Sequence, residues 1–341
     1  MKKRVPALPV CMLFFLLAGC TDGMENSWEK DGNAIRFSLP SLTRSINDLE
    51  DLKTAGEYAV WGHFIPEAGG QQGTTLFENE SIQYNQETNK WDYATDERYW
   101  IPGNTYHFHA LYPKDPASGT VNYSPTASGT LTINGFDASQ PADGTEMTDL
   151  LYASNTGILV STQADSPAPA SVSLSFRHLL ARVQFLGYTS DRYLGADGKP
   201  DGSVRELKIN SFKVTGIAAT GGWDGNKWTT TGEPTAIYEA PIGADGILLG
   251  NEPTNMFGDG GVLLLIPQSF TNLKVEITYE YTEGNLGTLT ATSSLQGTWE
   301  SGKSYSYKFS INSEIFFDTP QVDDWSEMPI HDNGLNIDVT K

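Results

Sequence analysis

The chain has 341 residues and a formal net charge of −20 at pH 7, from 22 basic and 42 acidic side chains. This length predicts two domains of moderate size, because one domain usually takes roughly 100 to 200 residues. The negative charge argues against nucleic acid and anionic lipid as ligands, since both would repel the chain.

The first twenty residues predict a lipoprotein signal peptide, residues 1–20. Three basic residues at positions 2–4 precede an apolar stretch, residues 10–17, that is too short to span a bilayer, and Leu17-Ala-Gly-Cys20 closes it. The only other cysteine, Cys11, lies inside the signal, so the exported chain has no disulfide. Cys20 is therefore the expected acyl acceptor. An ordinary signal peptide with a chance cysteine is the alternative, and it predicts export as well.

Export changes the charge and leaves a polar tether. Removal of residues 1–19 takes away three basic side chains and no acidic one, which changes −20 to −23. Residues 21–44 are then predicted to form a tether and a short strand, in which Ile35, Phe37 and Leu39 share one face. Arg44 and Ser45 follow in a polar, turn-prone stretch where a protease should find exposed backbone.

Residues 45–170 predict a first β-sandwich. Its expected strands are aromatic or β-branched runs bounded by Gly, Pro or Asn, at residues 58–64, 75–84, 90–93, 105–112 and 149–153. Residues 115–147 are poor in apolar side chains and are expected to be mainly loop. A Pro/Ala/Ser-rich linker, residues 166–170, ends this half.

Residues 171–341 predict a second β-sandwich. Residues 172–188 are expected to form the junction between the two sandwiches. Apolar residues alternate on both sides of a helix-like step at residues 178–181, which predicts one turn of helix between two strands. Further strands are expected at residues 204–217, 262–266, 274–281, 288–292 and 304–311, with an Asp-Gly turn between Trp223 and Trp228. The last run places Leu335, Ile337 and Val339 on one face, so it needs a partner.

The sequence argues against an enzyme and against a cofactor. Residues 297–304 match the phosphate-loop pattern GxxxxGK[ST], but the residues that follow alternate as a strand does, whereas a phosphate loop opens a helix. No GxSxG elbow and no cysteine remain for nucleophilic catalysis after processing. Carboxylates fall mainly in loops beside Gly, Asn and Thr, as expected of a solvated surface. We predict no catalytic residues.

Histidines and tryptophans offer two further routes to a ligand. His107 and His109 would share one face of a strand with His63 nearby, a pattern that suits either a zinc site or hydrogen-bonded structural histidines, and we expect the latter and no metal. Four tryptophans could stack on sugars or pack in cores, and packing is the expectation; they are Trp91, Trp100, Trp223 and Trp228.

Several short motifs occur in a fixed order over nearly the whole chain. They are Leu17-Ala-Gly-Cys20, Ile35-Arg-Phe before Thr43-Arg44, Tyr99-Trp-Ile-Pro-Gly103, Phe108-His-Ala-Leu-Tyr-Pro113, Asp149-Leu-Leu-Tyr-Ala153, Phe176-Arg-His-Leu-Leu-Ala181, Trp299-Glu-Ser-Gly-Lys-Ser-Tyr-Ser-Tyr307 and Trp325. In this order they resemble the fimbrillin family of bacterial surface pilins, sometimes called type V. The resemblance implies an all-β fold of two transthyretin-like β-sandwiches, an outer-membrane lipoprotein precursor, cleavage after an arginine, and assembly by strand exchange.

The resulting hypothesis is a structural or adhesive subunit of a cell-surface fimbria. Cleavage between Arg44 and Ser45 would release the strand of Ile35, Phe37 and Leu39, and the strand of Leu335, Ile337 and Val339, or its equivalent in a neighbouring subunit, would take its place. Partners would be other fimbrial subunits, the outer membrane through Cys20, and a host or bacterial surface ligand. The alternative is a surface lipoprotein that binds glycans or anchors a fimbria and never polymerises.

Overall fold

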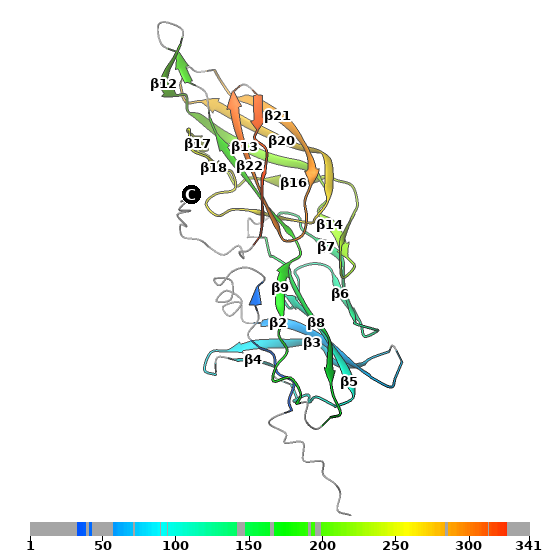
Figure 1. Cartoon of the computed structure of the whole chain (residues 1–341). Coiled ribbons are helices and arrows are strands. Elements are labelled where there is room, and N and C mark those ends of the chain that lie inside the picture. Colours follow the sequence, from blue (N-terminus) through cyan, green and yellow to red (C-terminus); the bar gives the residue numbers. More distant parts are fainter. Residues whose placement is uncertain are drawn as a thin grey trace, which may run out of the picture.

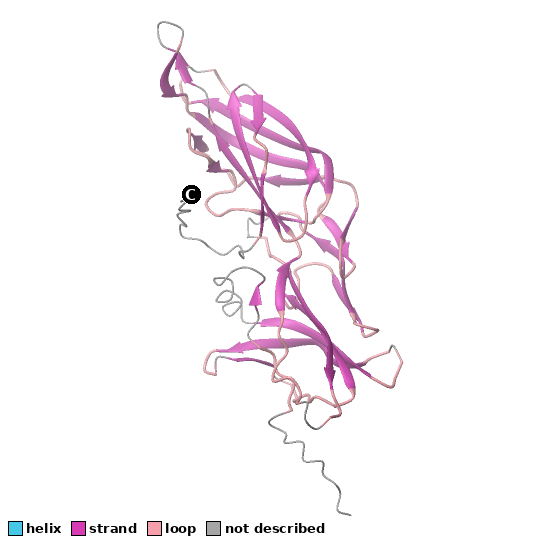
Figure 2. Ribbon diagram, viewed as in Figure 1, coloured by secondary structure: helices cyan, strands magenta, loops and turns pink. Residues whose placement is uncertain are grey.

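The computed structural model describes residues 33–38, 41–42, 57–70, 72–88, 90–93, 95–141, 147–163, 167–189, 192–194, 199–283, 286–312 and 314–325. Within these ranges the regular structure consists of strands, with no helix, as Figure 2 shows. The prediction of an all-β fold is confirmed. The described part also contains no helix long and apolar enough to cross a membrane.

The first sheet has seven strands and lies at the lower end of Figure 1. Its order is β1 (Ser41–Leu42), β9 (Ser175–His178), β8 (Leu151–Val160), β5 (Asn104–Tyr112), β2 (Glu57–Pro66), β3 (Thr74–Asn85) and β4 (Lys90–Tyr93). One face of this sheet packs around a core of fully buried aromatic rings, among them Tyr58, Phe77, Phe108 and Phe176. The predicted strands at residues 58–64, 75–84, 90–93 and 105–112 correspond to β2 to β5.

Two sheets of the later half pack face to face. One contains β18 (Thr254–Asn255), β10 (Ala181–Tyr188), β22 (Lys303–Asn312) and β23 (Glu314–Phe317), with β19 (Leu263–Leu265) beside β10 and β24 (Gln321–Asp324) beside β22. The other contains β16 (Ala236–Glu239), β13 (Leu207–Ile217), β20 (Ser269–Tyr281) and β21 (Leu289–Thr298), with β17 (Ile247–Leu249) beside β13. Alternating apolar residues of β10, β13, β20 and β22 fill the space between them.

A four-stranded sheet joins the two halves of the chain. Its order is β15 (Trp228–Thr231), β14 (Thr220–Trp223), β7 (Thr130–Asp137) and β6 (Thr120–Ser124). In Figure 1, β6, β7 and β14 lie between the first sheet and the later sandwich. The expectation of mainly loop at residues 115–147 is therefore wrong for β6 and β7. Their alternating apolar residues are few, because the hairpin buries only one face.

A third apolar core lies where these parts meet. It combines Trp61 of the first sheet, Ile133 of β7 and Trp223 of β14 with the buried Leu179 and Leu180. These two leucines connect β9, in the first sheet, to β10, in the later sandwich. The predicted helical turn at residues 178–181 is wrong, since the chain passes from one strand to the next without one. The apolar run that suggested a helix is buried on all sides instead.

The strands predicted at residues 204–217, 262–266, 274–281, 288–292 and 304–311 are confirmed in β13, β19, β20, β21 and β22, and the predicted terminal strand lies outside the described residues. The Asp-Gly turn joins β14 to β15, with Trp223 opposite Trp228. A separate two-stranded ribbon of β11 (Arg192–Leu194) and β12 (Pro200–Val204) stands at the upper end of Figure 1. Among the described residues, strand pairing crosses residue 170 at three places, β1 with β9, β8 with β9, and β7 with β14.

Candidate functional site

Residues 33–38, called here the N-terminal segment, lie between two parts of the first sheet that are far apart in sequence. On one side Ala34 pairs with Tyr99 and Phe37 with Trp91 of the edge strand β4, both antiparallel. On the other side Phe37 pairs in parallel with Val172, just before β9. The segment therefore bridges the β4 edge of the sheet and the chain that leads into β9.

Backbone hydrogen bonds hold the N-terminal segment on both sides. The Ile35 N–H donates to the Arg98 carbonyl at 2.8 Å, and the Trp100 N–H donates to the Asn33 carbonyl at 2.9 Å. Opposite them, the Val172 N–H donates to the Arg36 carbonyl at 2.7 Å, and the Ser38 N–H donates to the Val172 carbonyl at 2.9 Å. These are the contacts of an inserted strand, although the pairs are single bridges and not a continuous ladder.

The same segment supplies two side chains to the core. Ile35 is fully buried and Phe37 is 5% exposed. The Phe37 ring meets Phe77 and Phe108 edge to face, with centroids 5.6 and 5.9 Å apart. The prediction that Ile35 and Phe37 share an apolar face agrees with this arrangement. Each such side chain contributes roughly 1.5 to 3 kcal/mol of burial free energy.

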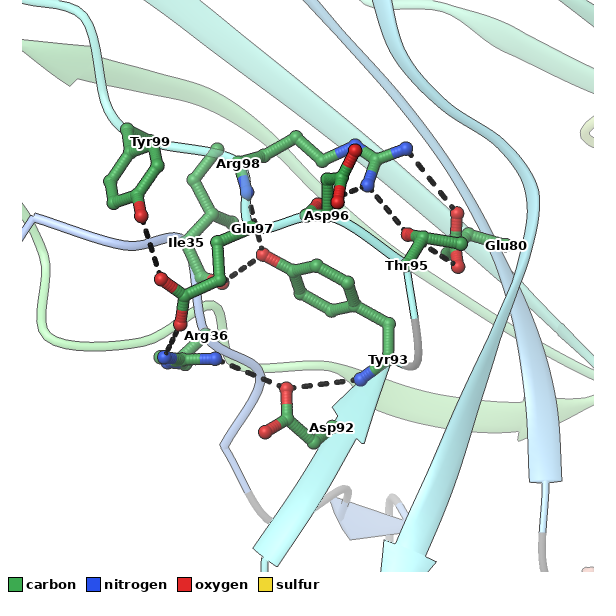
Figure 3. Close-up of polar contacts among 10 residues, drawn as sticks. All are labelled: Ile35, Arg36, Glu80, Asp92, Tyr93, Thr95, Asp96, Glu97, Arg98 and Tyr99. Carbon is green, nitrogen blue, oxygen red and sulfur yellow. Dashed lines mark hydrogen bonds and ion pairs between the residues drawn. The ribbon is translucent and has the colours of Figure 1, made fainter. Parts of the chain in front are cut away.

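A polar rim surrounds the outer face of the segment (Figure 3). The Arg36 guanidinium forms ion pairs with Asp92, at 3.2 Å, and with Glu97, to which it also donates a hydrogen bond. The hydroxyl of Tyr99 donates to the other Glu97 oxygen at 2.7 Å. These side chains are well exposed, so the ion pairs orient the segment more than they stabilise it.

Contacts within this polar rim shift the pKa values of Glu97 and Arg36. The hydrogen bonds from Tyr99 and then from Arg36 lower the pKa of Glu97. Burial acts to lower the pKa of Arg36, but the hydrogen bond to Glu97 and the charges of Asp92 and Glu97 outweigh it and raise that pKa. Both shifts favour the charged forms of Glu97 and Arg36 near neutral pH.

Asp92, Tyr93, Glu97 and Arg98, called here the receiving wall, lie against the segment. Contacts within the first sheet hold Tyr93 and Arg98 in place. The Tyr93 hydroxyl accepts from the Arg98 N–H at 3.0 Å and donates to the Ile35 carbonyl at 3.1 Å, and burial raises the pKa of Tyr93. The Arg98 side chain donates to the Leu76 carbonyl at 3.1 Å and its guanidinium lies 5.3 Å from the centre of the Phe77 ring. Of these wall contacts, only the one to Ile35 depends on the segment (Figure 3).

The chain continues along the same path after the segment. Ser41 and Leu42, which form β1, pair in parallel with Ser175 and Phe176 of β9. The N-terminal chain thus follows one line from Val172 to Phe176, and Arg44 comes two residues later in the sequence. The other predicted site residues lie outside the described residues; they are Cys20, Leu39, Arg44, Ser45, Leu335, Ile337 and Val339.

Comparison with known proteins identifies the family. The family model described as fimbrillin-like matches residues 52–325 of the 341-residue chain. The chain belongs to the fimbrillin-like family. This confirms the resemblance seen in its motifs. The matched range includes the receiving wall and Val172, and begins after the N-terminal segment.

Solved structures of low identity match this fimbrillin-like chain over most of their length, while no curated protein matches it. A proposed cell adhesion protein of Bacteroides ovatus is 16% identical with a TM-score of 0.49, covering 86% of this chain and 96% of that one. A second, from Bacteroides uniformis, is 13% identical with a TM-score of 0.45, covering 86% and 98%. A third, from Parabacteroides distasonis, is 11% identical with a TM-score of 0.43, covering 88% and 98%.

The metal, phosphate-loop and sugar-stacking routes considered from the sequence do not form a site within the described residues of this fimbrillin-like chain. Among the described residues no cluster of His, Cys, Asp or Glu is suited to a metal ion. Residues 297–304 run from the end of β21 through a turn into β22, a strand and not a helix. The four tryptophans considered for sugar stacking are all buried. Core packing, the expected role, is what the structure shows for them.

Sequence reasoning found the strand of the N-terminal segment but not its partners. The wall residues Asp92, Tyr93, Glu97 and Arg98 were not predicted to form a site. Their local sequence, a Lys-Trp-Asp-Tyr strand followed by acidic and basic residues, is that of an ordinary edge strand, so it does not indicate a binding site. The pairing of Phe37 with Val172, more than 130 positions away, cannot be predicted from a local sequence pattern.

Proposed function

We propose that this fimbrillin-like chain is a structural or adhesive subunit of a bacterial cell-surface fimbria, which assembles by strand exchange after lipidation and proteolytic cleavage. Membership of the family supports a fimbrial or adhesion-related role and a non-enzymatic one. The observation that carries the proposal is the N-terminal segment, a strand-like piece of chain that is inserted between two parts of the first sheet and buries Ile35 and Phe37.

Lipidation and cleavage would control this segment. Cys20 would carry acyl chains and hold the precursor on the outer membrane, because two or more chains give stable anchoring. Cleavage between Arg44 and Ser45 would separate Cys20, the N-terminal segment and β1 from the rest of the subunit. It would also free the subunit from its lipid.

Loss of the segment would create a groove. The Arg98 carbonyl and both backbone groups of Val172 would lose the partners they have now, and the sites of Ile35 and Phe37 would become apolar pockets. Unpaired strand edges with bare pockets favour addition of another strand, in which main-chain hydrogen bonds give affinity and side chains give specificity.

The proposed donor is the strand of Leu335, Ile337 and Val339, from this chain or from its equivalent in a neighbouring subunit. Its three apolar side chains have the same spacing as those of Ile35, Phe37 and Leu39. Burial of three such side chains would contribute on the order of 5 kcal/mol, at roughly 1.5 to 3 kcal/mol each before the cost of ordering the strand. Partners would be other fimbrial subunits and a surface ligand.

N-terminal sequencing of protein taken from the cell surface, with and without an arginine-specific protease, tests the cleavage. Ser45 as the first residue supports the proposal. Cys20 as the first residue under both conditions would show instead a lipoprotein that anchors a fimbria or binds glycans without polymerising. Palmitate labelling tests the lipid, since Cys20→Ser should abolish the label that the wild type takes up.

Strand exchange has a separate test. Protease-treated wild-type protein should give a boiling-resistant ladder on a denaturing gel, and Ile337→Asp should remove the ladder while the monomer stays folded. A ladder of unchanged intensity from Ile337→Asp would exclude this strand as the donor. A charge change at Asn336, on the opposite face of the same strand, is the matched control and should leave the ladder in place.

A further inference from the structure

Three histidines lie together under the turn of the β6–β7 hairpin. His63 of β2 is directly opposite His107 of β5, and their rings stack with centroids 4.9 Å apart and planes 17° apart. His109, two residues further along β5, comes next to them on the same face. All three are buried, at 0%, 8% and 4% exposure. They take no part in the groove described above.

The carbonyl contacts of His63 and His109 fix Nε2 as a protonated nitrogen in each ring. The Nε2–H of His63 donates to the Ala127 carbonyl at 3.1 Å, so its Nδ1 accepts from the Tyr123 hydroxyl at 2.5 Å. The Nε2–H of His109 donates to the Ser128 carbonyl at 2.9 Å, and its Nδ1 accepts from a second tyrosine hydroxyl at 2.7 Å, that of Tyr152. These Nδ1 atoms act as acceptors only while the imidazoles are uncharged.

His107 gives the strictest constraint of the three. Its Nδ1 accepts a hydrogen bond from the backbone N–H of Gly157 at 3.2 Å. A tyrosine hydroxyl can rotate and become an acceptor, but a backbone N–H cannot. A proton on Nδ1 of His107 would therefore place two donors face to face, next to a stacked imidazole.

The turn of the β6–β7 hairpin packs closely against the histidines. Gly129 has a φ of +81°, and a Cβ there would lie 2.7 Å from the Tyr123 hydroxyl and 2.8 Å from Nε2 of His109. Ala127 also has a positive φ, 49°, which an alanine rarely adopts. This strained backbone is the one whose carbonyl receives the His63 hydrogen bond. Strain of this kind persists only where surrounding contacts hold it.

The hairpin held in this way belongs to the sheet that joins the two halves of the chain. Its strand β7 pairs with β14, while its turn is attached to the first sheet by the histidines and by the Gly73 N–H, which donates to the Pro125 carbonyl at 2.7 Å. The histidine contacts therefore link the first sheet to the four-stranded sheet.

We propose that His63, His107 and His109 form an acid-sensitive clasp, which holds the β6–β7 hairpin on the first sheet at neutral pH and releases it on acidification. The clasp is independent of the strand exchange proposed above. It acts in the folded subunit whether or not the N-terminal segment has been removed.

The groups around the clasp do not offset protonation of the histidines. They are the Tyr123 hydroxyl from β6, the Tyr152 hydroxyl and the Gly157 N–H from β8, and the carbonyls of the turn. Burial raises the pKa of both tyrosines, so they stay neutral. Arg177 of β9 lies 5.4 Å from the Tyr152 ring centre and adds a further positive charge.

The direction of the pH dependence follows from the histidine pKa values. Burial lowers the pKa of all three, and for His107, where the charges of His63 and His109 add to the effect, it falls to about 4. The unfolded chain thus binds these protons more readily than the folded one, with an ordinary histidine pKa of about 6.5. The clasp is fully formed above about pH 6.5 and weakens as the pH falls toward 4.

Hydrogen exchange of the full chain, measured by mass spectrometry at pH 7.5 and 4.5 and corrected for intrinsic rates, tests the clasp. Protection of residues 120–137 should fall at least tenfold at pH 4.5, while β20 and β21 keep theirs. In His63→Gln/His107→Gln/His109→Gln, the side-chain amides can still donate to the two turn carbonyls and accept from the Gly157 N–H, and they do not titrate. The acid loss should therefore shrink to threefold or less.

Three results would overturn the proposal. They are unchanged protection of residues 120–137 at pH 4.5, an equal loss in β20 and β21, and a loss in the triple variant as large as in the wild type. If the triple variant is already unprotected at pH 7.5, histidine proton NMR of the wild type decides instead. Ring titrations below pH 6.5 that coincide with hairpin opening support the clasp, and titrations separate from it refute the clasp.

Discussion

Trp325 stacks flat on His178, with ring centroids 3.7 Å apart and ring planes 13° apart. Nδ1 of the same histidine meets a carboxylate oxygen of Asp149 at 2.5 Å, and all three side chains are buried. Burial raises the pKa of Asp149, and the contact with His178 opposes that shift. Trp325 follows directly on β24, so this stack pins the last described residue of the chain to the end of β9.

The stack should contribute strongly to stability through packing. Trp325→Ala removes a buried indole ring, and such truncations cost about 3 to 5 kcal/mol. Trp325→Phe keeps an aromatic face on His178 and should cost clearly less. Urea unfolding of both variants measures the difference, and equal losses from Ala and Phe would show that the stacked ring is not what matters.

Replacing His178 alone should cost more stability than replacing both members of the buried His178 and Asp149 pair. His178→Leu leaves the Asp149 carboxyl without its partner in an apolar site and should cost about 3 to 5 kcal/mol. Adding Asp149→Leu removes the stranded group and should recover part of that loss. A double-mutant cycle of unfolding free energies measures it, and strictly additive losses would contradict the coupling.

Two neighbours in the N-terminal segment should differ sharply in their effect on the uncleaved chain. Phe37→Ala removes a ring packed on Phe77 and Phe108 and should cost about 3 to 5 kcal/mol. Arg36→Ala removes exposed ion pairs and should cost less than about 1 kcal/mol, and less still in high salt. Thermal unfolding of the two variants makes the comparison.

The same pair of variants also reports on maturation. If cleavage after Arg44 removes the segment, Phe37→Ala and wild type become the same molecule after processing, and their unfolding curves should coincide. Curves that stay apart in protein starting at Ser45 would show that the segment remains bound.

Two glycines of the β6–β7 hairpin provide a matched pair. Both have a positive φ, 81° at Gly129 and 67° at Gly135, so alanine strains the backbone at either position, by about 1 kcal/mol. A Cβ at Gly135 meets nothing, whereas one at Gly129 collides with Tyr123 and His109. Gly129→Ala should therefore lose about 1 to 3 kcal/mol more stability than Gly135→Ala, by the usual cost of overpacking. Equal losses would mean that the turn does not sit on the histidines.

Local pattern was sufficient for most of the strands. β4, β13, β20 and β22 contain runs in which side chains alternate between a core and the opposite face, and that alternation is present in the sequence. It failed for β6 and β7, which have few apolar residues because their hairpin covers another sheet on one face only. It also failed at Leu179 and Leu180, where burial on every side resembled a helix.

Residue identity and spacing were enough to predict the all-β class, the family, and the apolar face of Ile35 and Phe37, because each depends on neighbouring residues. The folded structure was needed to show that Phe37 lies between Trp91 and Val172, that Arg36 meets Asp92 and Glu97, and that His63 stacks on His107. Those contacts join residues 44 to 135 positions apart in the sequence. Strand order and register bring them together, and neither is encoded in a local period.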